Sequence, residues 1–381
     1  MIYLDNATTS FPKPPQVYEA VDRFIRTIGA SAGRSAHDHS LKADRLVFSV
    51  RELVAALFHV GDASRIIFTL NATEALNLAL LGLVREGDSV VASSFEHNSV
   101  MRPLRFLQNE RRVKVEIIPC GPAGEFDLVR WEAALQNRPR MAVVNHGSNV
   151  IGVIAPIEAI GALCRKYGVL FLVDSAQTAG IVPIEADRAC IDLLAFSGHK
   201  GLLGIQGTGG LYIRKGIDPR PLKFGGTGSN SESDEQPLFM PDRYESGTQN
   251  VPGLAALRAG VAFVMEQGIG EIFSHESRLA GEFFREAQTI PRMRIHGPRT
   301  PQNMLPTISV TFDGLDNGIV AQRLNDEFGI AIRVGLQCAP MAHRTIGTFP
   351  KGTVRFSFGY FNTEEDAAQA VKALREICSG K

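Results

Sequence analysis

Short apolar runs alternate with longer amphipathic segments along the first part of the chain. The runs carry few charges and end in polar or glycine-rich turns, which is typical of buried parallel strands. The segments between them have apolar residues at helical spacing. The predicted strands are 65–70, 89–92, 113–119, 141–144, 169–173, 193–196 and 210–213, and the predicted helices are 16–27, 41–58, 71–83, 128–136 and 157–167. The alternation predicts an α/β fold with a mainly parallel sheet that is covered by helices and binds ligands at its carboxyl edge.

The pattern changes after residue 213. A long segment rich in Gly, Ser and acidic residues, 224–241, predicts an extended loop. The rest predicts a compact α/β unit with strands 307–312, 331–334 and 353–358 and helices 252–267, 269–289, 317–327 and 363–377. We therefore predict an N-terminal arm (1–15), a large domain (16–250) and a small C-terminal domain (251–381).

Composition narrows the class of protein. The chain has 381 residues, 44% apolar and 21% charged, which is typical of a soluble globular protein with more than one core. Its 40 basic and 40 acidic residues form no long run of one sign, so nothing points to nucleic acid or to an anionic membrane. The chain shows no membrane-spanning stretch and no signal peptide. Its five scattered cysteines favour a reducing compartment over a disulfide framework or zinc site, so we expect a cytoplasmic enzyme without a metal.

Polar side chains follow two of the predicted strands. Asp174 and Gln177 come after 169–173, and Ser197, Gly198, His199 and Lys200 come after 193–196. A carboxylate and a lysine at adjacent strand ends suit pyridoxal phosphate, which needs an anion at its ring nitrogen and an amine for a Schiff base. An Asp at a strand end is also typical of a helix N-cap, and a lone Lys of the surface. Lys200 lies between His199 and glycines, which is unusual for a surface lysine and favours a cofactor-binding role.

Two further strand ends carry candidate residues. Ala72 and Thr73 open the helix after 65–70, and free amides at a helix start commonly bind phosphate, although an ordinary capped helix explains the same residues. His97 follows 89–92 and has the flat ring needed to stack on a planar cofactor, or is simply a polar loop residue. Asn149 lies in a polar segment after 141–144.

These motifs together resemble a known family. The matching segments are Asn71–Glu74, Glu96–His97, Asp174 with Gln177, Ser197–Lys200 and Tyr244–Thr248. They resemble the class V aminotransferases of pyridoxal-phosphate fold type I, and within them the cysteine desulfurase and selenocysteine lyase branch. The resemblance runs from Tyr3 to Arg355 and implies a large domain with a mainly parallel sheet and a smaller C-terminal α/β domain.

The resemblance implies a role for each cofactor residue. Lys200 would form the Schiff base and move the α-proton of the substrate, and Asp174 would pair with the ring nitrogen. Gln177 would hydrogen-bond the phenolic oxygen, and His97 would stack on the ring. The phosphate would be held by Ala72, Thr73, Ser197 and His199, with Thr248 reaching it from the second subunit of a homodimer.

Two residues are implied at the substrate carboxylate, Asn149 and Arg355. The planar fork of an arginine binds a carboxylate by two parallel hydrogen bonds. Considered alone, Arg355 on a late strand is equally consistent with a surface ion pair.

The assignment to the cysteine desulfurase and selenocysteine lyase branch depends on Cys338. It lies on a predicted loop with Gly335 and Pro340 close on either side. A cysteine here resembles that of the group II desulfurases, whose thiolate attacks the sulfur of bound cysteine. That group often has histidines just before the cysteine, where this chain has Leu336 and Gln337, so we consider His343 and His37 as sources of acid–base help. The alternative is an unreactive loop thiol, because reactivity needs access and a lowered pKa.

The sequence therefore predicts a cysteine desulfurase that converts L-cysteine to L-alanine. A persulfide on Cys338 would pass to a sulfur-acceptor protein, as iron–sulfur cluster assembly requires. The alternatives are a selenocysteine lyase, another class V reaction such as transamination or racemisation that does not use Cys338, and a non-catalytic protein on the same fold.

Overall fold

The chain forms two main sheets and a further two-stranded one in the computed structural model, which describes residues 1–33, 37–300 and 304–379. The larger sheet has seven strands in the order β2-β8-β7-β6-β5-β3-β4. Its strands are β2 (Ile66–Thr69), β3 (Ser89–Ser93), β4 (Lys114–Ile118), β5 (Met141–Asn145), β6 (Leu170–Asp174), β7 (Leu193–Ser197) and β8 (Gly209–Ile213). Only β8 runs antiparallel to its neighbours, which confirms the predicted mainly parallel sheet.

Helices cover both faces of this sheet. One face packs against α1 (Pro15–Thr27), α2 (Asp38–Leu57), α5 (Leu128–Gln136), α6 (Ile157–Tyr167) and α7 (Val251–Gln267), and a short 3-10 turn, η1 (Ala63–Arg65), precedes β2. The other face packs against α3 (Ala72–Leu83) and α4 (Asn98–Arg111). Alternate residues of one strand enter opposite cores: Phe171 and Val173 face the first, and Leu172 faces the second. Burial on both faces is the reason why the inner strands β5, β6 and β7 are continuous apolar runs, whereas the edge strand β4 exposes Lys114 and Glu116.

The sequence did not predict α4. Pro103 lies inside this helix, and a proline removes a backbone donor and usually argues against a helix interior. The helix nevertheless buries Val100, Leu104 and Leu107 along one face against α3. Packing of that face outweighs the local cost of the proline.

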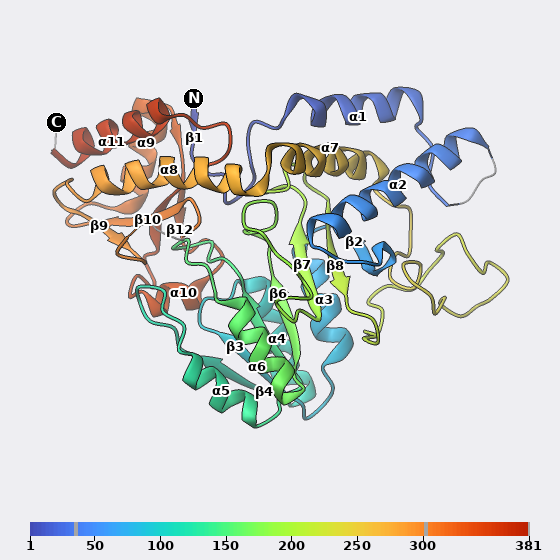
Figure 1. Ribbon diagram of the computed structural model, residues 1–381. Helices are drawn as coiled ribbons and strands as arrows, with labels where there is room; N and C mark the ends of the chain where they lie inside the picture. The colour runs from blue at the N-terminus through green and yellow to red at the C-terminus, as the bar shows by residue number, and fades with distance from the viewer. Residues whose placement is uncertain (34–36, 301–303, 380–381) are drawn as a thin grey trace.

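The smaller sheet is antiparallel, in the order β12-β13-β10-β9. Its strands are β9 (Met293–His296), which was not predicted, β10 (Thr307–Phe312), β12 (Arg333–Gly335) and β13 (Thr353–Ser357). The helices of this part are α8 (Ile269–Ala287), α9 (Asn317–Phe328), α10 (Pro340–Thr345) and α11 (Glu364–Ser379). Two further strands, β1 (Ile2–Tyr3) and β11 (Ile330–Ala331), pair in parallel and bring the N-terminus beside the C-terminal part, as Figure 1 shows.

The packing bears on where the domains divide. Apolar side chains of α7, including Leu257 and Val264, belong to the core of the seven-stranded sheet. Those of α8 from Leu279 onward belong to the core of the smaller sheet. We therefore propose that the small domain begins near Gly268, between α7 and α8, instead of at the predicted residue 251. Within the described ranges, no helix is long and apolar enough to cross a membrane.

Candidate active site

The predicted residues meet at the carboxyl edge of the larger sheet. Strands β5, β6 and β7 are neighbours in parallel, and Asp174 at the end of β6 lies in register with Asn145 on one side and Ala195 on the other. Ser197 ends β7, and Lys200 follows in the next turn. Because parallel strands all end at the same edge of a sheet, these polar groups come together in one place.

Asp174 and Lys200 affect each other's charge. Asp174 is 3% exposed, and one of its carboxylate oxygens accepts a hydrogen bond from Ala176 N at 2.9 Å. Burial raises the pKa of Asp174, and the Lys200 ammonium opposes that rise. Burial lowers the pKa of Lys200 to about 8, while Asp174 and Cys338 act to raise it and Arg355 to lower it. The lysine therefore holds a substantial neutral fraction near pH 8, as an amine nucleophile needs.

A hydrogen-bonded chain connects the start of α3 with the start of α4. Thr73 Oγ1 lies 2.7 Å from Ser99 Oγ, which lies 2.9 Å from His97 Nδ1. Ser99 N also donates to His97 Nδ1, so that nitrogen is an acceptor and the proton of the neutral ring is on Nε2. Burial, followed by the positive charge of Lys200, lowers the pKa of His97 to about 4, which keeps the ring neutral. Ser99 was not among the predicted residues, because nothing in its local sequence separates it from an ordinary helix-start serine.

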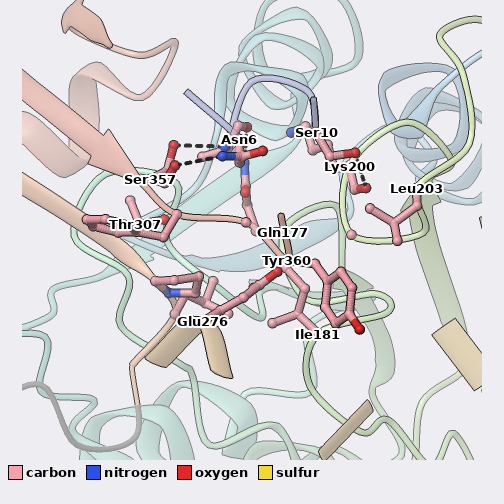
Figure 2. Close-up of a pocket in the computed structure, with 16 residues that line it drawn as sticks. Asn6, Ser10, Gln177, Ile181, Lys200, Leu203, Glu276, Thr307, Ser357 and Tyr360 are labelled. Carbon is pink, nitrogen blue, oxygen red and sulfur yellow. Dashed lines mark hydrogen bonds between the residues drawn. The ribbon is translucent and has the colours of Figure 1, made fainter. Parts of the chain in front are cut away.

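The N-terminal arm packs over the segment that carries Lys200. Ser10 Oγ donates to Lys200 O at 3.0 Å, and Asn6 Nδ2 donates to Ser357 O at 3.0 Å, as Figure 2 shows. Gln177 Nε2 donates to Ala7 O at 2.9 Å, which leaves its second amide hydrogen for another acceptor. The arm therefore supports predicted cofactor residues from the side of the small sheet.

A small cavity lies at this junction of the arm and the two sheets. Its lining includes Gln177, Lys200, Tyr360 and Glu276 of α8 (Figure 2). Glu276 is 4% exposed, and its Oε2 has no hydrogen-bond partner among the residues that the structure describes. Burial raises the pKa of this carboxyl to about 8, so it is protonated at neutral pH.

The structure also brings together the two residues predicted to bind the substrate carboxylate. Arg355 is 2% exposed, and its Nη1 donates to Asn149 O at 2.9 Å. Its Nη2 donates to Asp5 Oδ1 at 2.7 Å and to Thr8 Oγ1 at 2.9 Å. Within the described part of the chain, Arg355 Nε and Asn149 Oδ1 are buried without a hydrogen-bond partner. A polar ligand beside them can therefore gain hydrogen bonds that the protein alone leaves unmade.

Cys338 is the exposed one of the five free cysteines. It lines a groove with Thr73, His97 and Phe106. Its carbonyl oxygen accepts a hydrogen bond of 2.8 Å from Asn98 N at the start of α4. Asn98 was not predicted as a site residue. The loop of the small sheet thus places a thiol beside the predicted cofactor residues of the large one.

Three predicted residues lie outside this cluster. Thr248 is exposed and lines a surface hollow with Leu70 and Gly207, so its predicted role across a dimer interface stays a prediction. His343 is fully buried and directs both ring nitrogens at Gln337 and Thr348, which corrects the expectation that it assists the thiol. His37 instead caps α2 by accepting from Ser40 N.

The residues present fit pyridoxal phosphate. His199 Nδ1 is buried and has no hydrogen-bond partner in the described ranges, which leaves it for an acceptor or donor of a ligand. Among the residues that the structure describes, Lys200 is the one cation that acts on the raised pKa of Asp174, so a cationic ring nitrogen would stabilise the carboxylate further. The first amides of α3 and the neighbouring Thr73 hydroxyl can hold a phosphate.

Comparisons with known proteins agree with this geometry. The family model described as "Aminotransferase class-V" matches residues 2–369. A probable cysteine desulfurase of Methanothermobacter thermautotrophicus is 33% identical, over 99% of this chain and 94% of its own length. The apo structure of a cysteine desulfurase from Thermococcus onnurineus has a TM-score of 0.94 at 31% identity and covers 100% of this chain and 95% of that one. A cysteine desulfurase structure from Escherichia coli has a TM-score of 0.88 at 26% identity, covering 100% and 94%. The chain therefore belongs to the class-V aminotransferase family, in its cysteine desulfurase branch.

Proposed function

We propose that the protein uses pyridoxal phosphate to remove sulfur from L-cysteine, releasing L-alanine and leaving a persulfide on Cys338. The observation that carries the proposal is the position of this thiol. Cys338 is exposed and lines a groove together with His97 and Thr73. A transaminase or racemase needs no thiol at that place.

Each group of the cofactor has residues suited to hold it. Lys200 would bind the aldehyde carbon, Asp174 the ring nitrogen and Gln177 the phenolic oxygen. Ala72, Thr73, Ser197 and His199 would hold the phosphate, and the neutral ring of His97 would stack on the cofactor. When bound, pyridoxal phosphate withdraws electrons from the α-carbon of an amino acid and so makes its α-proton acidic.

The pKa of Lys200 supports a second role in moving protons. A group with a pKa of about 8 is present in both protonation states near neutral pH, which is the condition for efficient acid–base catalysis. The amine of Lys200, when it is free and neutral, would take the proton from the α-carbon of the substrate.

Arg355 and Asn149 would orient the substrate through its carboxylate. The guanidinium is fully buried and already oriented by Asp5 and Thr8, so binding requires little further ordering of its side chain. A carboxylate held there fixes which bonds of the α-carbon face Lys200.

The sulfur transfer itself would belong to Cys338. Its thiolate attacks the substrate sulfur, a sulfur–sulfur bond forms, and the bond between that sulfur and the β-carbon breaks with its electron pair left on carbon. The β-carbon takes up a proton, the α-carbon regains a proton from Lys200, L-alanine leaves, and Cys338 carries the sulfur as a persulfide. A thiol on an acceptor protein then takes the outer sulfur and restores the enzyme.

We further propose a homodimer in which Thr248 binds the phosphate of the other subunit. Glu245, three residues before Thr248, is buried and forms an ion pair with Arg51 of α2, which fixes the base of this segment. Thr248 itself is exposed, as are the apolar residues Phe224 and Leu238 of the preceding loop. Light scattering would test the dimer: a monomeric protein that still binds the cofactor tightly would contradict this arrangement.

The test of the function is alanine release from L-cysteine by the purified protein with a thiol reductant. We expect equal amounts of alanine and sulfide. Cys338→Ser should abolish both while the absorbance of the bound cofactor is unchanged, and Lys200→Ala should abolish attachment of the cofactor through a borohydride-reducible bond. A Cys338→Ser protein that forms alanine at the wild-type rate would contradict the mechanism. Activity only with L-selenocysteine would move the assignment to a selenocysteine lyase.

A further inference from the structure

The residue before Cys338 has a buried side chain although the loop lies at the surface. Gln337 is 5% exposed, whereas Cys338 is exposed. Gln337 Nε2 donates to Thr353 O of β13 at 3.0 Å, and Gln337 Oε1 accepts from His343 Nε2 at 2.8 Å. The amide group thus has hydrogen bonds at both of its ends inside the small domain.

His343 completes this arrangement from α10. Because Gln337 Oε1 can only accept, the ring proton of His343 is on Nε2, and Nδ1 then accepts from the Thr348 hydroxyl at 2.7 Å. Burial lowers the pKa of His343 to about 4, so the ring stays neutral. Both ring nitrogens are occupied, which leaves none for the Cys338 thiol. We call Gln337, His343, Thr348 and Thr353 the Gln337 network.

The loop backbone is held in an uncommon conformation. Gln337 and Cys338 have φ values of 41° and 57°, in the left-handed region that side-chain-bearing residues seldom adopt. Gln337 O accepts from Asn149 Nδ2 at 2.7 Å, and Cys338 O accepts from Asn98 N at 2.8 Å. The backbone bonds come from helix α4 and from the loop after β5, and the side-chain bonds come from the small domain. Together they over-determine the strained turn.

We propose that Gln337 is a positioning residue whose buried network holds Cys338 in the left-handed turn, so that its sulfur meets the substrate sulfur beside His97. The inference rests on the proposed function for what the thiol does, but not for the order of the loop. Without the network, both residues can relax to ordinary φ values and the thiol moves. A displacement of about 1 Å at a reacting group can cost on the order of 100-fold in rate.

The test compares Gln337→Met, which keeps the length of the side chain and removes its hydrogen bonds, with a matched control. Thr345→Val on α10 loses a hydroxyl that is bonded to Ser94 and takes no part in the network. Hydrogen–deuterium exchange of residues 334–341 reports loop order without any activity. We expect several-fold faster exchange in Gln337→Met, including the Ala339 amide that donates to Leu336 O, and no change in Thr345→Val.

The second readout separates thiol positioning from cofactor chemistry. Exchange of the α-proton of L-alanine in deuterated water needs the cofactor and Lys200 but not Cys338. We expect Gln337→Met to lower kcat for alanine formation from L-cysteine at least tenfold, with α-proton exchange within about twofold of wild type. Thr348→Val, which removes only the far end of the network, should give a smaller loss of the same kind.

Three outcomes would overturn the inference. The first two are wild-type desulfuration and wild-type loop exchange in Gln337→Met. The third is an equal loss of α-proton exchange and desulfuration, which would indicate general damage to the fold. If the wild-type protein released no alanine, the proposed function would fail by itself, and the exchange comparison would still decide whether the Gln337 network orders the loop.

Discussion

The Arg355 guanidinium donates to the carboxylate of Asp5 at 2.7 Å, across a sequence separation of 350 residues. Arg355 side-chain exposure is 2% and that of Asp5 is 17%, so the ion pair is largely shielded from water. It connects the N-terminal arm to the strand that carries the predicted substrate-binding residue. The N-terminal arm therefore contributes to the candidate site, although its residues are far in sequence from Arg355.

Replacing Asp5 by Asn should leave the buried guanidinium without its counter-ion. Removing one partner of a buried pair typically costs about 3–5 kcal/mol, because the other charge stays buried and uncompensated. We expect a loss near the lower end of that range in the free energy of unfolding, measured by urea denaturation. Asp22→Asn, at the exposed Arg26–Asp22 pair, is the control and should change it by less than about 1 kcal/mol. Equal effects of the two variants would contradict the structural role of Asp5.

The Arg51–Glu245 pair predicts a coupling between stability and cofactor binding. Both side chains are 4% exposed, and Glu245 Oε1 also accepts from Phe68 N at 2.7 Å. Glu245→Gln should destabilise the protein by about 3 kcal/mol and also weaken binding of pyridoxal phosphate, since Thr248 follows on the same segment. Fluorescence titration of the apoprotein measures the affinity. Unchanged affinity in a folded variant would show that Thr248 does not depend on this ion pair.

The pKa of Lys200 predicts how cofactor attachment depends on pH. Only the neutral amine attacks an aldehyde, so the attachment rate to the apoprotein should rise with pH and level off above about 8. The Asp174 carboxylate raises this pKa, so in Asp174→Asn the midpoint should move to lower pH. Stopped-flow absorbance over pH 6–10 measures both curves. A midpoint near the ordinary lysine value, or an upward move in the variant, would contradict the electrostatics described above.

Glu276 predicts a pH dependence of stability with a definite sign. Its pKa is raised to about 8 in the folded protein, so between the unfolded value of 4.5 and about 8 the folded state binds the extra proton. This group therefore costs increasing stability as the pH rises through that window, and the cost levels off above it. Glu276→Gln should be more stable than wild type at pH 8, by on the order of a few kcal/mol, and equal to it near pH 4. Thermal denaturation at the two pH values measures the difference, and a constant offset would contradict the prediction.

At the edge of the larger sheet, β4 exposes Lys114 and Glu116. The inner strands were predictable because they are buried on both faces. Such strands are uninterrupted apolar runs, and β6 and β7 begin and end within a residue or two of the predicted limits. Helix α4 and strand β9 were not predictable in this way. The proline of α4 argues against a helix locally, and β9 is only 4 residues long and partly exposed.

The residues of the candidate site also fall into those that the sequence could identify and those that it could not. Asp174, Ser197 and Lys200 could be identified from the sequence because each follows a recognisable strand, and parallel strands must end at one edge. Ser99, Asp5 and Asn98 could not, because their local sequence is ordinary and their contacts come from distant segments.

The sequence by itself thus determined the family and the sheet and predicted the candidate cofactor residues, since these depend on short-range patterns of burial and on motifs. Only the tertiary structure decided how the Cys338 loop is held and that His343 lies beneath it with both ring nitrogens bonded. The physical reason is that a hydrogen bond needs its two partners within about 3 Å, and the partners here come from segments whose approach depends on the packing of both domains.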